Sequence, residues 1–133
     1  MPDEIDSFLN QKLWAVIGVS NNPTKYGNKV YHQLKKAGYS VYAINPGLES
    51  FDGDPCYSSL AALPTVPDVV SVVVPPKITE QVITDCINLG INRVWLQPGS
   101  ENEEAILNGE QHGIAVIHDQ CVLIQTRDKG SLL

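Results

Sequence analysis

The sequence is poor in cysteine and contains no long apolar run. Its three cysteines, Cys56, Cys86 and Cys121, are odd in number, lie far apart and form no C-x-x-C pair. Neither a disulfide framework nor a zinc site is therefore expected. The longest largely apolar segment, residues 69–74, contains Ser71 and is far too short to span a bilayer. The acidic opening residues lack the basic, then apolar, order of a secretion signal. These absences predict a reduced, cytoplasmic protein without a membrane partner.

Positive charge is also scarce. Nine Lys and Arg residues stand against fifteen Asp and Glu residues, so the formal net charge of the 133 residues is −6. A protein that binds the nucleic-acid backbone normally has the opposite balance, so no nucleic-acid partner is expected. An anionic ligand stays open, because the N-terminus of a helix can hold phosphate without net positive charge. The length predicts a single domain over residues 1–133 that buries a core of its own.

Five apolar segments recur at similar intervals, at residues 14–19, 40–44, 69–74, 93–96 and 115–117. Most are short, β-branched and apolar at consecutive positions, which is typical of strands buried on both faces of a parallel sheet. Helical spacing of apolar residues predicts helices between them. We expect these helices at residues 28–37 and 79–89, after a capping box at residues 100–103, as a short helix at 58–63, and as an amphipathic N-terminal helix at 3–13.

This alternation predicts an α/β fold, a Rossmann-like doubly wound five-stranded parallel sheet of strand order 3-2-1-4-5 with an extra N-terminal helix. Ligands of such folds bind beyond the carboxyl ends of the strands, at the switch point, here expected between the first and fourth strands. Candidate site residues should therefore lie in the loops that follow residues 19, 44, 74 and 96.

The first of these loops departs from the dinucleotide fingerprint. That fingerprint, G-x-G-x-x-G, would need glycine at positions 18, 20 and 23, and only Gly18 fits, since Ser20 and Pro23 occupy the other two. Gly27 opens the following helix, whose free backbone N–H groups could hold a diphosphate with help from Ser20 and Lys25. An ordinary strand-to-helix turn is the other interpretation.

The second and third loops also differ from an NAD site. Asn45 and Pro46 follow the second strand, where an NAD-binding domain usually places an Asp or Glu for the ribose hydroxyls. NAD is therefore less favoured than another nucleotide. The third strand ends in Val74, Pro75 and Pro76, an apolar wall that suits a purine or an alkyl-amide arm. A plain turn and a rigid loop are the simpler interpretations.

The fourth loop offers an amide and a glycine. Gln97 ends a buried strand, so its side chain needs a partner, which could be protein, water or ligand. Gly99 allows the backbone or a ligand to approach closely.

No catalytic or metal residue is expected. His118, Asp119 and Cys121 are neighbours in sequence, but a nucleophilic dyad needs side chains that meet in space. No nucleophile elbow or P-loop is present. Binding without catalysis is the preferred interpretation. A thioester-handling enzyme that uses Cys121, and an NAD(P)- or other nucleotide-binding sensor or interaction domain, are the alternatives.

These motifs together resemble the CoA-binding protein family, small Rossmann-like domains related to the N-terminal domain of the succinyl-CoA synthetase α-subunit. The resemblance covers about residues 13–124 and rests on the order of motifs that are each weak alone. The motifs are Trp14-Ala15-Val16-Ile17-Gly18-Val19-Ser20 with Pro23 and Gly27, residues 41–46, residues 55–60 with Leu63-Pro64, Pro67-Asp68-Val69-Val70, Trp95-Leu96-Gln97 with Gly99, and Asp119-Gln120-Cys121.

The resemblance implies coenzyme A or an acyl-CoA as the small-molecule partner, with no ligase activity, because the second domain of the larger synthetases is lacking. It implies that the diphosphate and adenosine use Gly18, Val19, Ser20, Pro23, Lys25, Tyr26 and Gly27. Asn45 and Pro46 would lie beside the nucleotide. The adenine or the pantetheine arm would be flanked by Val74, Pro75, Pro76, Leu96, Gln97, Pro98 and Gly99. A protein partner or a homo-oligomer stays open.

Overall fold

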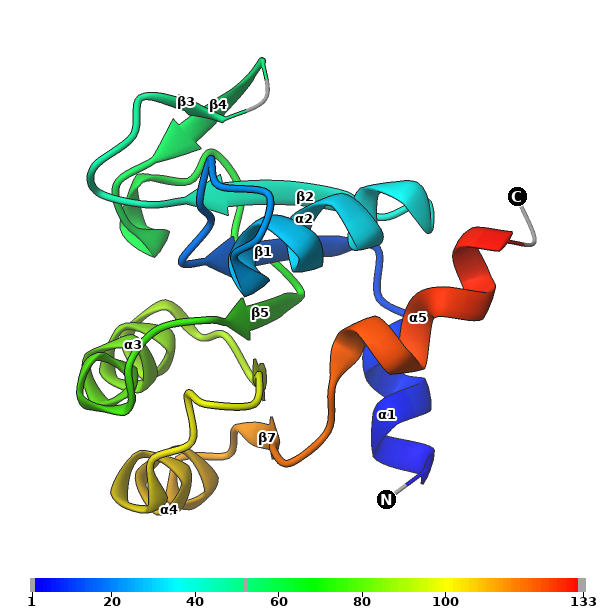
Figure 1. Ribbon diagram of the computed structural model, residues 1–133. Helices are drawn as coiled ribbons and strands as arrows, with labels where there is room; N and C mark the ends of the chain where they lie inside the picture. The colour runs from blue at the N-terminus through cyan, green and yellow to red at the C-terminus, as the bar shows by residue number, and fades with distance from the viewer. Residues whose placement is uncertain (1, 52, 132–133) are drawn as a thin grey trace.

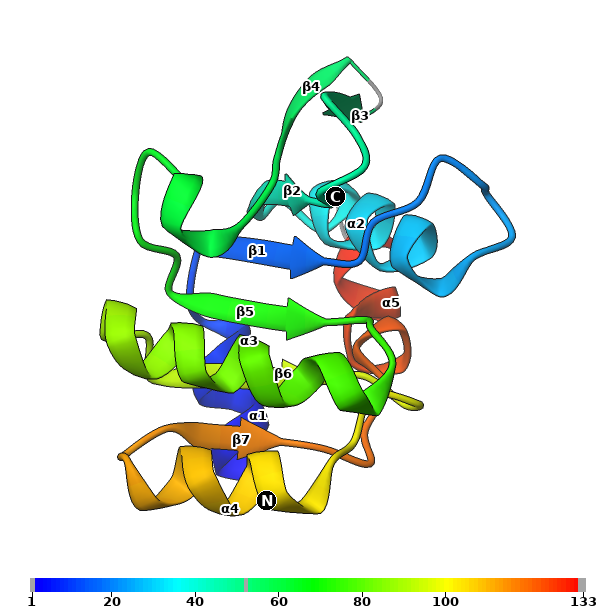
Figure 2. The same cartoon turned by 90° about the vertical axis from the view of Figure 1, so that its left-hand side faces the viewer.

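A seven-stranded sheet forms the centre of the computed structural model, which describes residues 2–51 and 53–131. The strands lie in the order β3-β4-β2-β1-β5-β6-β7, and every neighbouring pair is parallel except β3 and β4. Figure 2 shows the long strands pointing in one direction, so their carboxyl ends share one edge. The strands are β1 (Leu13–Ile17), β2 (Ser40–Ile44), β3 (Ser50–Phe51), β4 (Asp54–Tyr57), β5 (Val69–Val72), β6 (Arg93–Leu96) and β7 (Ala115–Ile117).

Helices cover both faces of the sheet. One face carries α1 (Pro2–Leu9), α2 (Tyr26–Lys36) and α5 (Val122–Ser131), and the other carries α3 (Pro76–Leu89) and α4 (Glu103–Gln111) (Figure 1). A short 3-10 helix, η1 (Leu60–Ala62), packs near α3. None of the described helices is long and apolar enough to cross a membrane.

The core is split in two by the sheet. Trp14 and Trp95 are fully buried on the side of α1, α2 and α5, with ring centroids 6.2 Å apart. On the other side, Val70 and Val94 pack with the buried residues of α3 and α4, including Ile83. Consecutive strand residues point to opposite faces, so a sheet covered on both sides needs apolar residues at consecutive positions. This explains the consecutive apolar residues of β1, of β6 after Arg93 and of β5 on both sides of Ser71.

The α/β doubly wound class is confirmed, but the predicted strand order is wrong. The five predicted strands lie in the order 2-1-3-4-5, because β5 pairs with β1 on the side away from β2. The place beyond β2 is taken by β4, a short strand that contains Pro55 and has no apolar run to reveal it. Counted from β4, the parallel strands read 3-2-1-4-5-6, and the switch point lies between β1 and β5.

Several helix boundaries also differ from prediction. The N-terminal helix ends at Leu9 rather than 13, and α5 was not predicted. The predicted capping box is wrong, because Asn102 caps α4 by accepting a 3.0 Å hydrogen bond from the backbone N–H of Ala105. Ser100 lies in the preceding loop, where its hydroxyl is hydrogen-bonded to the backbone N–H of Val74 and does not cap the helix. A capping-box pattern cannot distinguish these two arrangements from sequence alone, since both put a polar side chain before the helix.

Candidate ligand-binding site

Two adjoining cavities lie at the carboxyl edge of the sheet, beside the switch point. The first encloses about 500 Å³ and the second about 410 Å³. They share lining residues at the ends of β1, β2 and β5, so they form one elongated site. The first is lined by Gly18, Val19, Ser20, Lys25, Tyr26, Gly27, Asn45, Val73, Val74, Pro75, Pro98, Gly99 and Ser100. The second is lined by Ile17, Gly18, Ile44, Asn45, Pro46, Ser58, Ser59, Leu60, Val73, Val74, Pro75, Ile78, Gln81, Val82 and Asp85.

The N-terminus of α2 opens into the first cavity. Lys25 is the N-cap residue and its side chain makes no capping hydrogen bond, and the first turn contains no acidic residue. Within the described residues, no acceptor is found for the backbone N–H groups of Tyr26, Gly27 and Asn28. These groups are the positive end of the helix dipole. An anion placed in the cavity would therefore meet unpaired donors on one side.

Two glycines bring the end of β1 and the start of α2 into backbone contact. Gly18 has φ +99°, and a Cβ atom built on it would lie 1.9 Å from the carbonyl oxygen of Val73. A Cβ atom on Gly27 would lie 2.0 Å from the carbonyl oxygen of Gly18. Any side chain at either position would push α2 or β5 away. The two glycines therefore set how closely α2 and the end of β5 approach the end of β1, and this spacing shapes the first cavity.

Asn45 fastens the second loop to the first. Its Nδ2 donates a 2.7 Å hydrogen bond to the carbonyl of Val19, and its Oδ1 accepts a 2.8 Å bond from the N–H of Gly47. Nearby, Nδ2 of Asn28 donates to the carbonyl of Ser20 at 2.7 Å. Both polar atoms of the Asn45 side chain thus already have protein partners. This side chain holds the loops and does not replace the carboxylate of an NAD site.

Ser100 joins the third and fourth loops. It is 2% exposed, and its hydroxyl accepts a 2.9 Å hydrogen bond from the N–H of Val74. Its carbonyl accepts a 2.8 Å bond from Oγ1 of Thr79, and Nδ2 of Asn102 donates to the carbonyl of Pro76 at 2.9 Å. The two loops are therefore one rigid wall. Ser100 was not predicted as a site residue, because it was assigned to the capping box.

Gln97 is fully buried and finds its partners within the protein. Its Nε2 donates to Oγ of Ser71 at 3.0 Å, while its Oε1 accepts from the N–H of Val122 at 3.0 Å and from the hydroxyl of Tyr26 at 3.3 Å. The Tyr26 hydroxyl also contacts Sγ of Cys121. Burial, followed by this contact with Cys121, raises the pKa of Tyr26 above its ordinary value. Gln97 thus links a residue of the cavity, Tyr26, to the start of α5.

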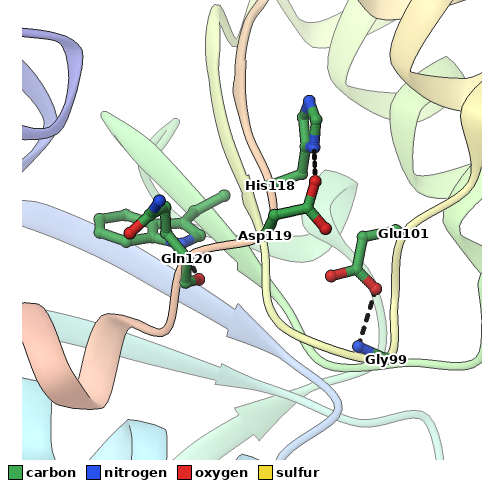
Figure 3. Close-up of polar contacts among 6 residues, drawn as sticks. Gly99, Glu101, His118, Asp119 and Gln120 are labelled. Carbon is green, nitrogen blue, oxygen red and sulfur yellow. Dashed lines mark hydrogen bonds and ion pairs between the residues drawn. The ribbon is translucent and has the colours of Figure 1, made fainter. Parts of the chain in front are cut away.

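Carboxylates lie beside the fourth loop. Figure 3 shows the side chains of Glu101 and Asp119 turned toward one another, from the loop before α4 and the loop after β7. Glu101 accepts a 2.8 Å hydrogen bond from the N–H of Gly99, and Oδ2 of Asp119 lies 2.6 Å from Nδ1 of His118. Asp119 has φ +62°, which few residues other than glycine adopt. No cluster of three metal-ligating residues occurs among the residues that the structure describes.

The structure brings most of the predicted site residues together and leaves four outside. Pro46 lines only the second cavity, and the others that line the site are Gly18, Val19, Ser20, Lys25, Tyr26, Gly27, Asn45, Val74, Pro75, Pro98 and Gly99. Pro23, Pro76, Leu96 and Gln97 line neither cavity. Leu96 and Gln97 are fully buried, Pro23 lies on an exposed loop, and Pro76 begins α3. Contact of any of these residues with a ligand stays a prediction.

The predicted apolar wall of Val74 and Pro75 lines the second cavity, but the apolar side chains that η1 and α3 add to it were not predicted. Its additional lining comes from η1 and α3, whose residues Leu60, Ile78 and Val82 face the ends of β1 and β2. Strand-end reasoning reaches only the loops that directly follow strands, so it cannot find side chains that a neighbouring helix contributes. The spacing of Ile78 and Val82, four residues apart on one face of a helix, was the sequence signal that could have indicated this contribution.

Comparison with known proteins assigns the family. The model of a family described as "CoA binding domain" matches residues 12–127, which is most of the chain. The chain belongs to this CoA-binding domain family. The α-subunit of an ADP-forming acetate–CoA ligase II of Pyrococcus furiosus is 30% identical over 129 residues, which cover 89% of this chain and 28% of the subunit. A second ligase, ADP-forming acetate–CoA ligase I of Archaeoglobus fulgidus, is 27% identical, and 18% of its length is covered.

Relatives of similar length to this CoA-binding domain also exist. The Bacillus subtilis protein YneT, whose name states no function, is 29% identical over 122 residues that cover 91% of this chain and 90% of YneT. A solved structure of a hypothetical protein from Pyrococcus horikoshii superposes with a TM-score of 0.90 at 29% identity, over 96% of this chain and 89% of that one. The chain thus spans less than a third of the ligases' length, and nearly all of the smaller relatives.

Proposed function

We propose that this chain binds coenzyme A or an acyl-CoA in the two adjoining cavities and carries out no chemistry on it. The observation that carries the proposal is the set of backbone N–H groups of Tyr26, Gly27 and Asn28 in the first turn of α2, for which the described residues supply no acceptor. Tyr26 and Gly27 line the first cavity. Two phosphates placed there would accept hydrogen bonds from these groups and lie at the positive end of the α2 dipole. Lys25 would add a positive charge from the same edge.

The rest of the ligand would lie on either side of the diphosphate. The adenine suits the second cavity, because its walls include the apolar side chains of Ile44, Leu60 and Val82, and a planar base gains from burial against such surfaces. The pantetheine arm would run past Pro98 and Gly99. The combined volume of the two cavities is in the range of sites for cofactor-sized molecules.

NAD(P) is the weaker alternative. A site for NAD needs an acceptor for the ribose hydroxyls at the end of β2, and both polar atoms of Asn45 are already hydrogen-bonded to Val19 and Gly47. The thioester-handling alternative is also weaker, because Cys121 lines neither cavity and its sulfur contacts the Tyr26 hydroxyl.

Calorimetry with coenzyme A, acetyl-CoA and NAD tests the proposal. We expect saturable one-to-one binding of coenzyme A or acetyl-CoA and no heat with NAD. Binding of NAD together with no detectable binding of coenzyme A would overturn the assignment. Free thiol is followed in parallel during incubation with acetyl-CoA, and none should appear. Thiol release that is lost in Cys121→Ala would replace the binding role with an enzymatic one.

A further inference from the structure

The charges of this acidic chain are unevenly distributed. Residues 7–48 contain five lysines and no Asp or Glu, so this segment carries a net charge of +5 and the remainder carries −11, with histidine neutral. Four of the five lysines lie at the N-cap or within α2. They are Lys25, Lys29, Lys35 and Lys36. The positive charge is thus concentrated on one helix.

Two of these lysines share a face of α2 and have no carboxylate partner among the described side chains. Lys29 and Lys36 are seven residues apart, so they lie two turns and about 10 Å apart along the helix. Both are exposed, and no ion pair with either is found in the described part of the chain, whereas Nζ of Lys35 lies 2.7 Å from Oδ2 of Asp54. Lys29 also stands in the first turn, where the helix dipole repels a cation. Its position therefore weakens the helix locally instead of supporting it.

A hollow between α2 and α5 contains these two lysines. It encloses about 420 Å³ and is lined by Asn28, Lys29, His32, Gln33, Lys36 and Leu123, and we call it the lysine hollow. Its described lining offers ammonium, amide and imidazole groups beside one apolar side chain, and contains no acidic residue. It shares no lining residue with the two cavities at the sheet edge. In Figure 1, α2 and α5 lie on the same side of the sheet.

We propose that the lysine hollow docks a carboxylate-rich segment of a partner protein. Carboxylates one or two helical turns apart match the spacing of Lys29 and Lys36, and an apolar residue beside them would cover Leu123. A nucleic acid fits less well, because an extended polyanion would meet the −11 charge of the remaining chain. A second copy of this chain also fits less well, since a hollow filled by a different surface of the second copy is a head-to-tail contact, whereas the commonest oligomers close through a two-fold interface that uses the same surface on both copies.

A labelled alanine-based peptide with glutamates at helical spacing serves as the probe, and its glutamine counterpart serves as the uncharged reference. Fluorescence anisotropy at low salt should show binding of the glutamate peptide alone. The double variant Lys29→Gln, Lys36→Gln should weaken this binding about tenfold, because two exposed ion pairs are lost. The matched double variant Lys12→Gln, Lys77→Gln removes two exposed lysines elsewhere and should change it less than about twofold.

Several results would overturn the proposal. These are no binding of the glutamate peptide, an equal loss in both double variants, or equal binding of a short RNA that depends on the same lysines. Concentration-dependent self-association that Lys29→Gln, Lys36→Gln abolishes would show that a second copy is the occupant. Coenzyme A affinity is measured on the same variants. It should stay within about twofold, so failure of the docking proposal is distinguishable from failure of the binding function.

Discussion

The first loop and the end of β6 lie on the same edge of the sheet but use their polar groups differently. Around the first loop, the backbone N–H groups of Tyr26, Gly27 and Asn28 have no acceptor among the described residues. At the end of β6, Gln97 is buried and both its nitrogen and its oxygen are hydrogen-bonded within the protein. Unpaired donors at an open cavity suit a ligand, whereas internally paired groups suit a scaffold.

The largest expected effect is that of Gly18→Ala, which disturbs the close backbone approach between the first loop and the end of β5. The new Cβ would meet the carbonyl of Val73 and would impose φ +99° on alanine, so we expect a loss of about 3 kcal/mol in the free energy of unfolding. Coenzyme A binding should weaken with it. Urea unfolding and calorimetry measure both quantities.

Gly113→Ala is the matched control for that substitution. Gly113 has φ +83°, but no described atom beyond its two chain neighbours lies within 4 Å of the place that its Cβ would take, so only the backbone cost of about 1 kcal/mol should appear. Equal losses in the two variants would mean that the close approach of β1 and β5 adds nothing to the stability.

Gln97→Leu tests the scaffold side of the comparison. It removes the partners of Ser71, Val122 and Tyr26 in a buried place, and we expect a loss of about 2 kcal/mol in the free energy of unfolding. Coenzyme A affinity, measured well below the unfolding temperature, should change less than about twofold. The exposed Gln111→Leu should cost less than about 0.5 kcal/mol. A large loss of affinity with intact stability would make Gln97 a ligand contact.

Lys25→Gln tests the electrostatic part of the first loop. Because Lys25 is exposed beside the proposed diphosphate, we expect about a fivefold loss of coenzyme A affinity at low salt and a smaller loss at high salt. Lys12→Gln, which lies before β1 at the opposite edge of the sheet, is the control. Equal affinities for the two variants would remove Lys25 from the site.

The smallest effect should appear at alkaline pH. Burial and the contact with Cys121 hold the pKa of Tyr26 above its ordinary value of 10.0. The unfolded chain therefore ionises at Tyr26 first, so the free energy of unfolding should fall as the pH rises above 10. Tyr26→Phe should reduce this fall, while Tyr39, whose pKa is also raised by burial, remains in both proteins. Thermal unfolding at a series of pH values measures the difference, and identical pH dependence would contradict it.

The sequence allowed the strands and the site edge to be predicted because both depend on local patterns. Consecutive apolar residues such as those of β1 reveal a strand buried on both faces, and the loops that follow such strands meet at one edge. The strand order could not be predicted correctly, because β4 is recognisable only from its pairing with β2. A four-residue strand with a proline has no periodicity to detect.

Within the site, backbone features were easier to predict than side-chain partners. Gly18 and Gly27 stand out by residue type, and both line the first cavity. Gln97 was expected to need a partner, but whether ligand or protein supplies it depends on where Ser71 and Val122 lie in space. The role of Ser100 likewise depends on Val74, which is 26 residues away in the chain.

Backbone amide shifts of the labelled protein during titration with coenzyme A test the central claim most directly. If the diphosphate binds at the N-terminus of α2, the largest shifts should fall on the N–H signals of Tyr26, Gly27 and Asn28, with small shifts at the N–H of Val122. Saturating coenzyme A that leaves those three signals unmoved would contradict the account.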